Sequence, residues 1–274
     1  MSNLSVKEMI NAGVHFGHQS KYWNPKMSPY IYTTYKKLHI INLEKSIEQF
    51  NSAINFIEKL IKNNSKILFV GTKRAARELI EKYAIESKMP YVNNRWLGGM
   101  LTNFDTVRES IRKLENLHSH ISSTQASTTM TKKETLSIKK QIQKLEKNLM
   151  GIKDLEKLPD ALFVIDTRYE KIAIKEANKL NIPVIAIVDS NNSFDGVDYM
   201  IPGNDDSMSS INLFVKEISK TIIDVKSKSS KPADNTINKS KYTSSKSLKK
   251  KQIIDVEQKQ DKVNFKKRSD NKEK

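Results

Sequence analysis

The 274-residue sequence has no cysteine, no long apolar run and fewer acidic than basic residues. Without cysteine, a disulfide scaffold, thiol chemistry and a cysteine-ligated zinc site are excluded. The longest apolar run, Val184–Val188, is far too short to cross a bilayer. The first residues, MSNLSVKEMINAG, lack the apolar stretch of a signal peptide. We therefore expect a soluble cytoplasmic protein.

Basic residues outnumber acidic residues by 48 to 31, which gives a formal net charge of +17. The last part of the chain, residues 226–274, has 16 Lys and Arg against 6 Asp and Glu, a net charge of +10. Residues 1–225 are also basic, at +7. Because both parts are basic, an anionic partner is the first hypothesis.

Short apolar runs alternate with helix-like segments and predict an α/β fold. The runs typical of strands lie at 38–42, 66–71, 161–166 and 184–189, with shorter or weaker candidates at 91–93 and 199–202. Apolar residues at helical spacing predict helices at 43–62, 75–84, 170–180 and 207–225. Runs without alternation fit strands covered on both faces. We therefore predict a parallel sheet of about five strands between two helical layers.

Between residues 106 and 152 the pattern changes to two helices with heptad spacing. Val107 and Ile111 begin one apolar seam, and Ile138 and Ile142 begin the other. A polar stretch at 122–129 separates the two helices, and the sequence TKKE at 131–134 fits a capping box that opens the second. This pattern predicts an antiparallel helical hairpin inserted into the sheet domain.

From about residue 226 the apolar periodicity stops, and Ser, Lys, Asn and Asp dominate. Such a composition predicts a tail that is disordered in isolation. The expected organisation has an α/β sheet domain formed by 1–105 and 151–225, with an N-terminal extension at 1–37, a helical hairpin at 106–150 and a lysine-rich tail at 226–274.

Residues 21–37 interleave aromatic and basic side chains in a loop-like stretch that includes Lys21, Trp23 and Lys26. Aromatic planes beside ammonium groups suit nucleic acid, because bases stack on the rings while the cations meet phosphates. The alternative is that Trp23 and the tyrosines cap one end of the sheet. The sequence leaves both interpretations open.

Two loops that follow predicted strands are candidates for binding phosphate. The segment 93–104, NNRWLGGMLTNF, brings Arg95 together with paired glycines, which let the backbone approach a phosphate. Alternatively it is a strained turn that packs Trp96. The segment 71–74, GTKR, leads into a helix whose N–H groups attract anions. The segment matches no nucleotide-binding motif. Because Arg77 follows one helical turn later, we favour RNA phosphate as its ligand.

Several acidic and histidine residues permit an enzymatic or metal-binding interpretation. Asp166 and Asp189 end two predicted strands, where an enzyme would use them to bind Mg²⁺. Without a general base, nucleophile or phosphate loop, we favour caps of turns or helices. Residues 204–207 are likewise predicted to supply acidic caps to the last helix. His15 and His18 offer two metal ligands without an identifiable third, so the sequence predicts no metal site.

Seven motifs are distributed along the chain: AGVHFGH at 12–18, YWNPKM at 22–27, HIINLEK at 39–45, FVGTKRA at 69–75, NRWLGGMLTN at 94–103, LPDALFVID at 158–166 and IPGNDD at 201–206. Together they resemble those of ribosomal protein two of the small subunit, in its bacterial form. The match runs in the family's order from about residue 5 to residue 225.

This resemblance implies a flavodoxin-like three-layer fold with the inserted hairpin, no catalysis and no cofactor. It also implies a cytoplasmic component of the small subunit that binds small-subunit rRNA and supports docking of ribosomal protein one beside other subunit proteins. The candidate rRNA contacts are Lys21, Trp23, Lys26, Lys73, Arg74, Arg77, Arg95, Trp96, Arg108 and Arg112.

The chain departs from the family pattern in two places. Asn94 stands where many bacterial members have His, and the tail is long and basic where family tails are usually short and often acidic. The tail is either a polybasic extension that binds rRNA or unselected drift. Two rival functions also stay open: a doubly wound enzyme or phosphoacceptor with Mg²⁺ at Asp166 and Asp189, and an RNA-binding regulator outside the ribosome.

Overall fold

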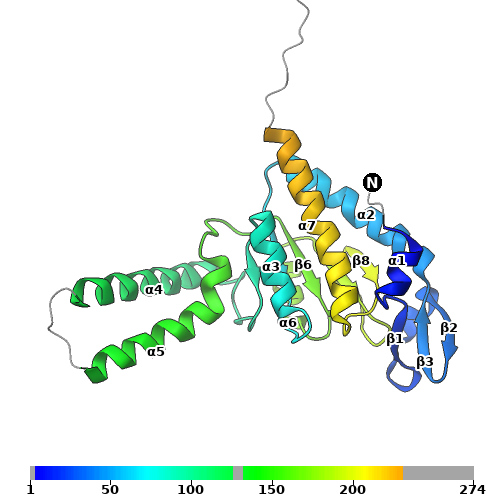
Figure 1. Ribbon diagram of the computed structural model, residues 1–274, viewed down its shortest axis with the longest axis horizontal. Coiled ribbons are helices and arrows are strands. Elements are labelled where there is room, and N and C mark those ends of the chain that lie inside the picture. Colours follow the sequence, from blue (N-terminus) through cyan, green and yellow to red (C-terminus); the bar gives the residue numbers. More distant parts are fainter. Residues whose placement is uncertain (1–3, 126–131, 231–274) are drawn as a thin grey trace, which may run out of the picture. The chain divides into compact units, whose positions relative to one another are not determined.

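The computed structural model describes residues 4–125 and 132–230 of the chain. Its centre is a five-stranded parallel sheet, which confirms the predicted α/β fold (Figure 1). In spatial order the strands are β5 (Tyr91–Val92), β4 (Ile67–Val70), β6 (Ala161–Ile165), β7 (Val184–Val188) and β8 (Tyr199–Pro202). The order of strands reverses between β4 and β6, and open α/β sheets commonly bind ligands at the carboxyl ends of the strands near such a point.

Helices cover both faces of this sheet. One layer contains α2 (Leu43–Lys62), α3 (Arg77–Ser87) and α7 (Met208–Ser230). The other layer includes α6 (Lys171–Lys179). Successive strand residues point to opposite sides, so Phe69 and Phe163 face the first layer while Val70 and Val164 face the second. This alternation explains why the strands read as unbroken apolar runs.

Helix α2 spans the residues that the apolar spacing predicts. Asn42 caps it, because its side-chain oxygen accepts hydrogen bonds from the N–H groups of Glu44 (3.0 Å) and Lys45 (3.4 Å). Phe50 and Ile54 belong to its buried stripe, which packs against the sheet. The helix therefore ties the N-terminal segment to the core.

The segment before α2 forms a separate antiparallel sheet, which corrects two sequence predictions. In spatial order its strands are β1 (Phe16–Gln19), β3 (Leu38–Ile41) and β2 (Ile31–Tyr35), and the segment also contains α1 (Val6–Asn11), η1 (Ser20–Tyr22) and η2 (Pro25–Tyr30). The run at 38–42 is thus not in the parallel sheet, and the stretch predicted as loop contains β2. The hairpin of β2 and β3 was not predicted, because Lys36 and Lys37 form its turn. Their φ angles are 46° and 66°, a conformation in which Asn or Gly is usual.

The predicted helical hairpin is confirmed. Helices α4 (Phe104–Gln125) and α5 (Lys132–Leu149) lie side by side and project from the sheet, and η3 (Met150–Ile152) leads back to it (Figure 1). The buried seam includes Val107, Ile111 and Ile142, and His118 Nε2 lies 3.0 Å from Glu146 Oε1 across the two helices. Helix α4 continues to Gln125, so the linker predicted from residue 122 begins too early. Thr131 of the predicted capping box lies outside the described residues.

Helix α7 extends five residues beyond the predicted end at 225. Lys226 Nζ donates a hydrogen bond of 2.7 Å to the carbonyl of Ser87, which joins the last turns of α7 to the end of α3. The helical residues at 226–230 therefore do not belong to the predicted tail. Residues 231–274 lie outside the described part of the chain. Among the residues that the structure describes, no helix has the length and apolar character needed to cross a membrane.

Candidate functional site

Polar side chains from five segments meet at the carboxyl edge of the parallel sheet. We call this group the polar cluster; its members are His18, Lys73, Asp166, Asp189, Asn192, Asp205 and Asp206. They come from β1 and from the loops that follow β4, β6, β7 and β8. The cluster therefore depends on tertiary contacts between residues as far apart in the chain as 18 and 206.

Lys73, a predicted rRNA contact, is the positive centre of the polar cluster. Its ammonium lies 2.7 Å from Asp205 Oδ1 and 3.2 Å from Asp166 Oδ2, and it also contacts Asp206. Burial by itself lowers the pKa of Lys73, but these carboxylates raise it above its ordinary value. The ammonium is thus occupied by internal partners, and we leave Lys73 out of the proposed RNA interface.

Asp205 and Asp166 share the amide of Asn192. Its nitrogen donates to Asp205 Oδ2 at 2.7 Å and to Asp166 Oδ1 at 3.1 Å. Burial, followed by the charges of Asp189 and Asp166, raises the pKa of Asp205 to about 8. The prediction that Asp205 caps α7 is wrong, because the side chain of Asn204 accepts the N–H bonds there. Asp205 is fully buried instead.

The predicted capping role of Asp166 is confirmed. Its Oδ1 accepts hydrogen bonds from the N–H groups of Arg168 (3.0 Å) and Tyr169 (3.1 Å) in the turn before α6. The residue has a φ of 69°, a left-handed conformation that Asp tolerates better than most residues. The Mg²⁺-binding role considered for Asp166 in the enzyme hypothesis therefore has a structural alternative in the hydrogen bonds of this turn.

His18 joins the N-terminal sheet to the loop after β7. The backbone N–H of His18 donates to Ser190 Oγ at 2.8 Å. A Cβ at position 17 would lie only 2.7 Å from this oxygen, so the close approach requires the glycine that is present there. His18 Nδ1 lies 3.1 Å from Asp189 Oδ2, and Nε2 lies 3.1 Å from Asp206 Oδ2. The contact with Asp189 raises the pKa of His18, against the opposite effect of burial.

The loop at 71–74, predicted to bind phosphate, is occupied by a carboxylate of the chain. Thr72 donates to Glu170 Oε1 through its N–H at 2.7 Å and through its hydroxyl at 2.6 Å. Arg77 Nε in turn donates to the carbonyl of Thr72 at 2.8 Å. Because Glu170 is only 2% exposed, it takes the place that we predicted for an RNA phosphate.

The glycine loop at 96–102 is occupied in the same way, by Glu176 of α6. Trp96 Nε1 donates to its Oε1 at 3.1 Å, as does the N–H of Gly99 at 2.8 Å. The N–H groups of Leu101 and Thr102 donate to Oε2 at 3.0 and 3.2 Å. Trp96 is 7% exposed, so its ring is not available to stack on a base, and we exclude it from the proposed interface.

The other predicted rRNA contacts are exposed. They are Lys21, Trp23, Lys26, Arg74, Arg95, Arg108 and Arg112. Trp23 is 38% exposed, and its ring centroid lies 5.2 Å from that of His39. Lys26 Nζ lies 2.6 Å from Asp195 Oδ1, an ion pair at the surface. Arg77 is half-buried and donates to the backbone, as described above, so of the ten predicted contacts Lys73, Arg77 and Trp96 have internal roles.

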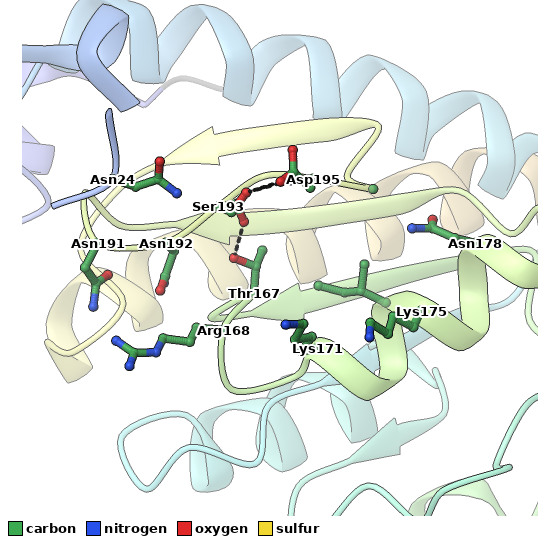
Figure 2. Close-up of a pocket in the computed structure, with 12 residues that line it drawn as sticks. Asn24, Thr167, Arg168, Lys171, Lys175, Asn178, Asn191, Asn192, Ser193 and Asp195 are labelled. Atoms are coloured by element: carbon green, nitrogen blue, oxygen red, sulfur yellow. Dashed lines mark hydrogen bonds between the residues drawn. The ribbon is translucent and has the colours of Figure 1, made fainter. Parts of the chain in front are cut away.

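A basic pocket that the sequence analysis did not identify opens beside the polar cluster (Figure 2). Its volume is about 510 Å³, and Asn24, Asn191 and Asn192 are among its lining residues. Figure 2 shows Arg168, Lys171 and Lys175 along one wall, the first in the turn before α6 and the other two in the helix. Lys171 and Lys175 lie four residues apart on one face of α6, and Arg168 lies three residues before Lys171 in the preceding turn, so this spacing could have revealed them.

Comparison with known proteins agrees with these observations. The family model described as Ribosomal protein S2 matches residues 9–225. A small ribosomal subunit protein uS2 from Marinobacter nauticus is 51% identical over 234 residues, which cover 85% of this chain and 93% of the relative. The uS2 of Pseudoalteromonas translucida is 52% identical over 222 residues, with 81% and 91% covered. The uS2 of Coxiella burnetii (strain RSA 493) is 49% identical over 227 residues, with 83% and 72% covered. The chain therefore belongs to the ribosomal protein S2 family, whose members are structural and non-enzymatic.

Proposed function

We propose that this chain binds small-subunit rRNA through exposed basic side chains around the carboxyl edge of its parallel sheet. Its family makes it a structural constituent of the small ribosomal subunit, which works in the bacterial cytoplasm. Binding to RNA requires cations that are free to neutralise phosphates and release counterions. The proposal therefore depends on which basic side chains already have partners within the protein.

The observation that carries the proposal is a division of the basic residues into two sets. Lys73 and Arg77 are occupied by groups of the chain itself. In contrast, the exposed side chains of Arg74, Arg95 and Arg168 make no ion pair or side-chain hydrogen bond with the rest of the described chain. All three follow strands of the parallel sheet, so their loops lie along one edge. A row of unpaired cations at one edge fits the phosphate backbone of RNA.

Two further features support an RNA-binding surface. Tyr32 and Tyr35 of β2 are 75% and 61% exposed, and the adjacent turn presents Lys36 and Lys37. Exposed rings beside lysines can stack on unpaired bases while the ammonium groups meet phosphates. On the helical hairpin, Arg108 and Arg112 of α4 are exposed and supply a second basic surface.

Assembly of a charge-depleted variant tests this proposal. The triple change Arg74→Ala, Arg95→Ala and Arg168→Ala removes three unpaired cations from the edge of the sheet. We expect weaker binding to small-subunit rRNA, with the slope of log K against log salt reduced by about 0.7–0.9 for each lost phosphate contact. Incorporation into small subunits, followed in sucrose gradients of cell lysate, should fall in parallel.

A matched control removes the same charge from the opposite edge of the sheet, with Lys59→Ala, Lys62→Ala and Lys157→Ala. These residues precede strands β4 and β6, and the control variant should assemble normally. Equal assembly of both variants would contradict the proposed interface. If the unmodified protein sedimented mainly with free proteins, the alternative of a regulator outside the ribosome would be favoured.

The second part of the proposal is that the chain supports docking of ribosomal protein one. It is supported by the family resemblance and by an exposed apolar set near the N-terminus: Val6, Ile10 and Phe16 are 41%, 49% and 47% exposed. Such side chains favour a protein partner more than RNA phosphate. We expect Ile10→Asp with Phe16→Asp to lower the amount of ribosomal protein one on purified small subunits without lowering the amount of this chain. Unchanged occupancy would contradict this docking surface.

A further inference from the structure

Three members of the polar cluster have the chemistry and spacing of metal ligands. His18, Asp189 and Asp205 each offer one nitrogen or oxygen atom, and these atoms lie within 4.8 Å of one another. They come from β1, from the loop after β7 and from the loop after β8. Asp189 and Asp205 are 1% and 0% exposed, so the fold holds two carboxylates almost out of contact with water. Burying carboxylates without a compensating cation is costly.

His18 and Asp189 meet in a close contact between an imidazole nitrogen and a buried carboxylate oxygen. His18 Nδ1 lies 3.1 Å from Asp189 Oδ2, yet this buried oxygen accepts no hydrogen bond from any described residue. An imidazole nitrogen and a carboxylate oxygen at this separation can both bind one metal ion. Asn192 Oδ1, beside Asp205, is also buried without a hydrogen-bond partner among the described residues.

The charges of the polar cluster do not balance. Its four carboxylates, on Asp166, Asp189, Asp205 and Asp206, face the ammonium of Lys73 and the imidazole of His18. With all four carboxylates ionised and the imidazole protonated, the formal charge is negative by two, and burial together with the neighbouring carboxylates raises the pKa of Asp205. A divalent cation bound to a neutral imidazole would reduce this excess to one, because it replaces one proton with two positive charges.

We propose that His18, Asp189 and Asp205 bind one Zn²⁺ ion, which fastens the N-terminal sheet to the carboxyl edge of the parallel sheet. One imidazole and two carboxylates are donors that suit zinc, whereas Mg²⁺ prefers oxygen ligands alone. The Nε2 atom of His18 lies 3.1 Å from Asp206 Oδ2, so this carboxylate orients the ring, as outer carboxylates do around zinc-bound histidines. The site does not depend on RNA binding.

The geometry requires only a small adjustment. Ligands bound to a tetrahedral zinc at about 2.0–2.2 Å lie roughly 3.3 Å apart, close to the 3.1 Å between His18 and Asp189. The widest separation in the set, at most 4.8 Å, has to shrink by up to about 1.5 Å as Asp205 moves closer. Both of its oxygens already accept hydrogen bonds, from Lys73 and Asn192, but a carboxylate has lone pairs left for a metal.

Zinc binding to the purified full chain tests the proposal. After treatment with chelator, the protein is dialysed against 10 µM Zn²⁺ with 1 mM Mg²⁺ present, and bound metal is measured by elemental analysis. We expect about one Zn²⁺ per chain, and less than a fifth of that in His18→Gln and in Asp189→Asn. The matched controls, His120→Gln and Asp105→Asn on the helical hairpin, should retain the ion.

Absorption of Co²⁺ bound in place of Zn²⁺ gives a second readout that needs no variant. A site with one nitrogen and several oxygen ligands should give visible bands that Zn²⁺ abolishes and Mg²⁺ does not. No zinc retained by the unmodified chain, equal retention in the His18 and Asp189 variants, or displacement of Co²⁺ by 1 mM Mg²⁺ would each overturn the proposal.

Discussion

Glu176 accepts a hydrogen bond from the indole nitrogen of Trp96 at 3.1 Å, across 80 positions of the sequence. The same carboxylate accepts N–H bonds from Gly99, Leu101 and Thr102, so one side chain holds the whole glycine loop. A loop whose N–H groups converge is a general anion-binding device, and here the anion belongs to the protein. The consequence is that this loop supports the fold rather than the RNA contact.

Replacing Glu176 by Ala should destabilise the fold. The change leaves an indole N–H and three backbone N–H groups without their acceptor at buried or partly buried positions, so we expect a loss of about 2–4 kcal/mol in the free energy of unfolding. Urea denaturation of the purified chain measures this loss. The control Glu78→Ala, at an exposed position in the first turn of α3, should change the unfolding free energy by less than about 0.5 kcal/mol. Similar effects of the two variants would contradict the role of Glu176.

The contribution of Glu176 should depend on pH. Burial by itself raises the pKa of Glu176, but the hydrogen bonds from Leu101, Gly99, Trp96 and Thr102 outweigh it and lower the pKa below its ordinary value. A lowered pKa stabilises the folded state above the unfolded pKa of about 4.3, and this stabilisation disappears as the pH falls through the folded value. The stability difference between the unmodified protein and Glu176→Gln should thus be constant from pH 6 to 8 and shrink below about pH 4. Urea titrations across this range give the result, and a difference that grew with acid would be the opposite outcome.

The two tryptophans should separate folding from RNA binding. Trp96→Phe removes the hydrogen bond to Glu176, and we expect a loss of about 1.5–3 kcal/mol in stability with unchanged RNA affinity of the folded protein. Trp23→Ala should leave stability nearly unchanged but weaken RNA binding by the equivalent of about 1–3 kcal/mol, if a base stacks on this exposed ring. Denaturation and filter binding of both variants test the contrast. A loss of RNA affinity confined to the Trp96 variant would reverse our assignment.

Two truncations should separate the contribution of the last turns of α7 to stability from the contribution of the following residues to RNA binding. Removal of 231–274 takes away more basic than acidic residues, so we expect normal stability and a smaller salt dependence of RNA binding. Removal of 226–274 also deletes the hydrogen bond from Lys226 to the carbonyl of Ser87, which should cost about 1 kcal/mol in addition. Melting curves and salt titrations of the two proteins are the measurements. An unchanged salt slope in both would show that these residues do not contact RNA.

The amino-acid sequence by itself determined the elements whose information is local. Apolar runs at Ile67–Val70, Ala161–Ile165 and Val184–Val188 predicted the central strands, and heptad spacing predicted the helical hairpin, because both patterns arise between residues a few positions apart. The N-terminal sheet was missed since its tight turn is made by Lys36 and Lys37, whose left-handed conformation no local preference indicates.

Only the tertiary structure decided which polar residues are free and which are occupied. Three carboxylates contact a predicted phosphate-binding loop, or its lysine, from 74 to 132 positions away in the chain: Glu170, Glu176 and Asp205. Likewise His18 reaches Asp189 only because β1 packs against the loop after β7. The composition establishes that cationic side chains are in excess. A cationic side chain can bind RNA, however, only if it is not already paired with a carboxylate of the protein. Pairing between residues so far apart in the chain depends on the sheet, which brings the carboxyl ends of its strands together at one edge.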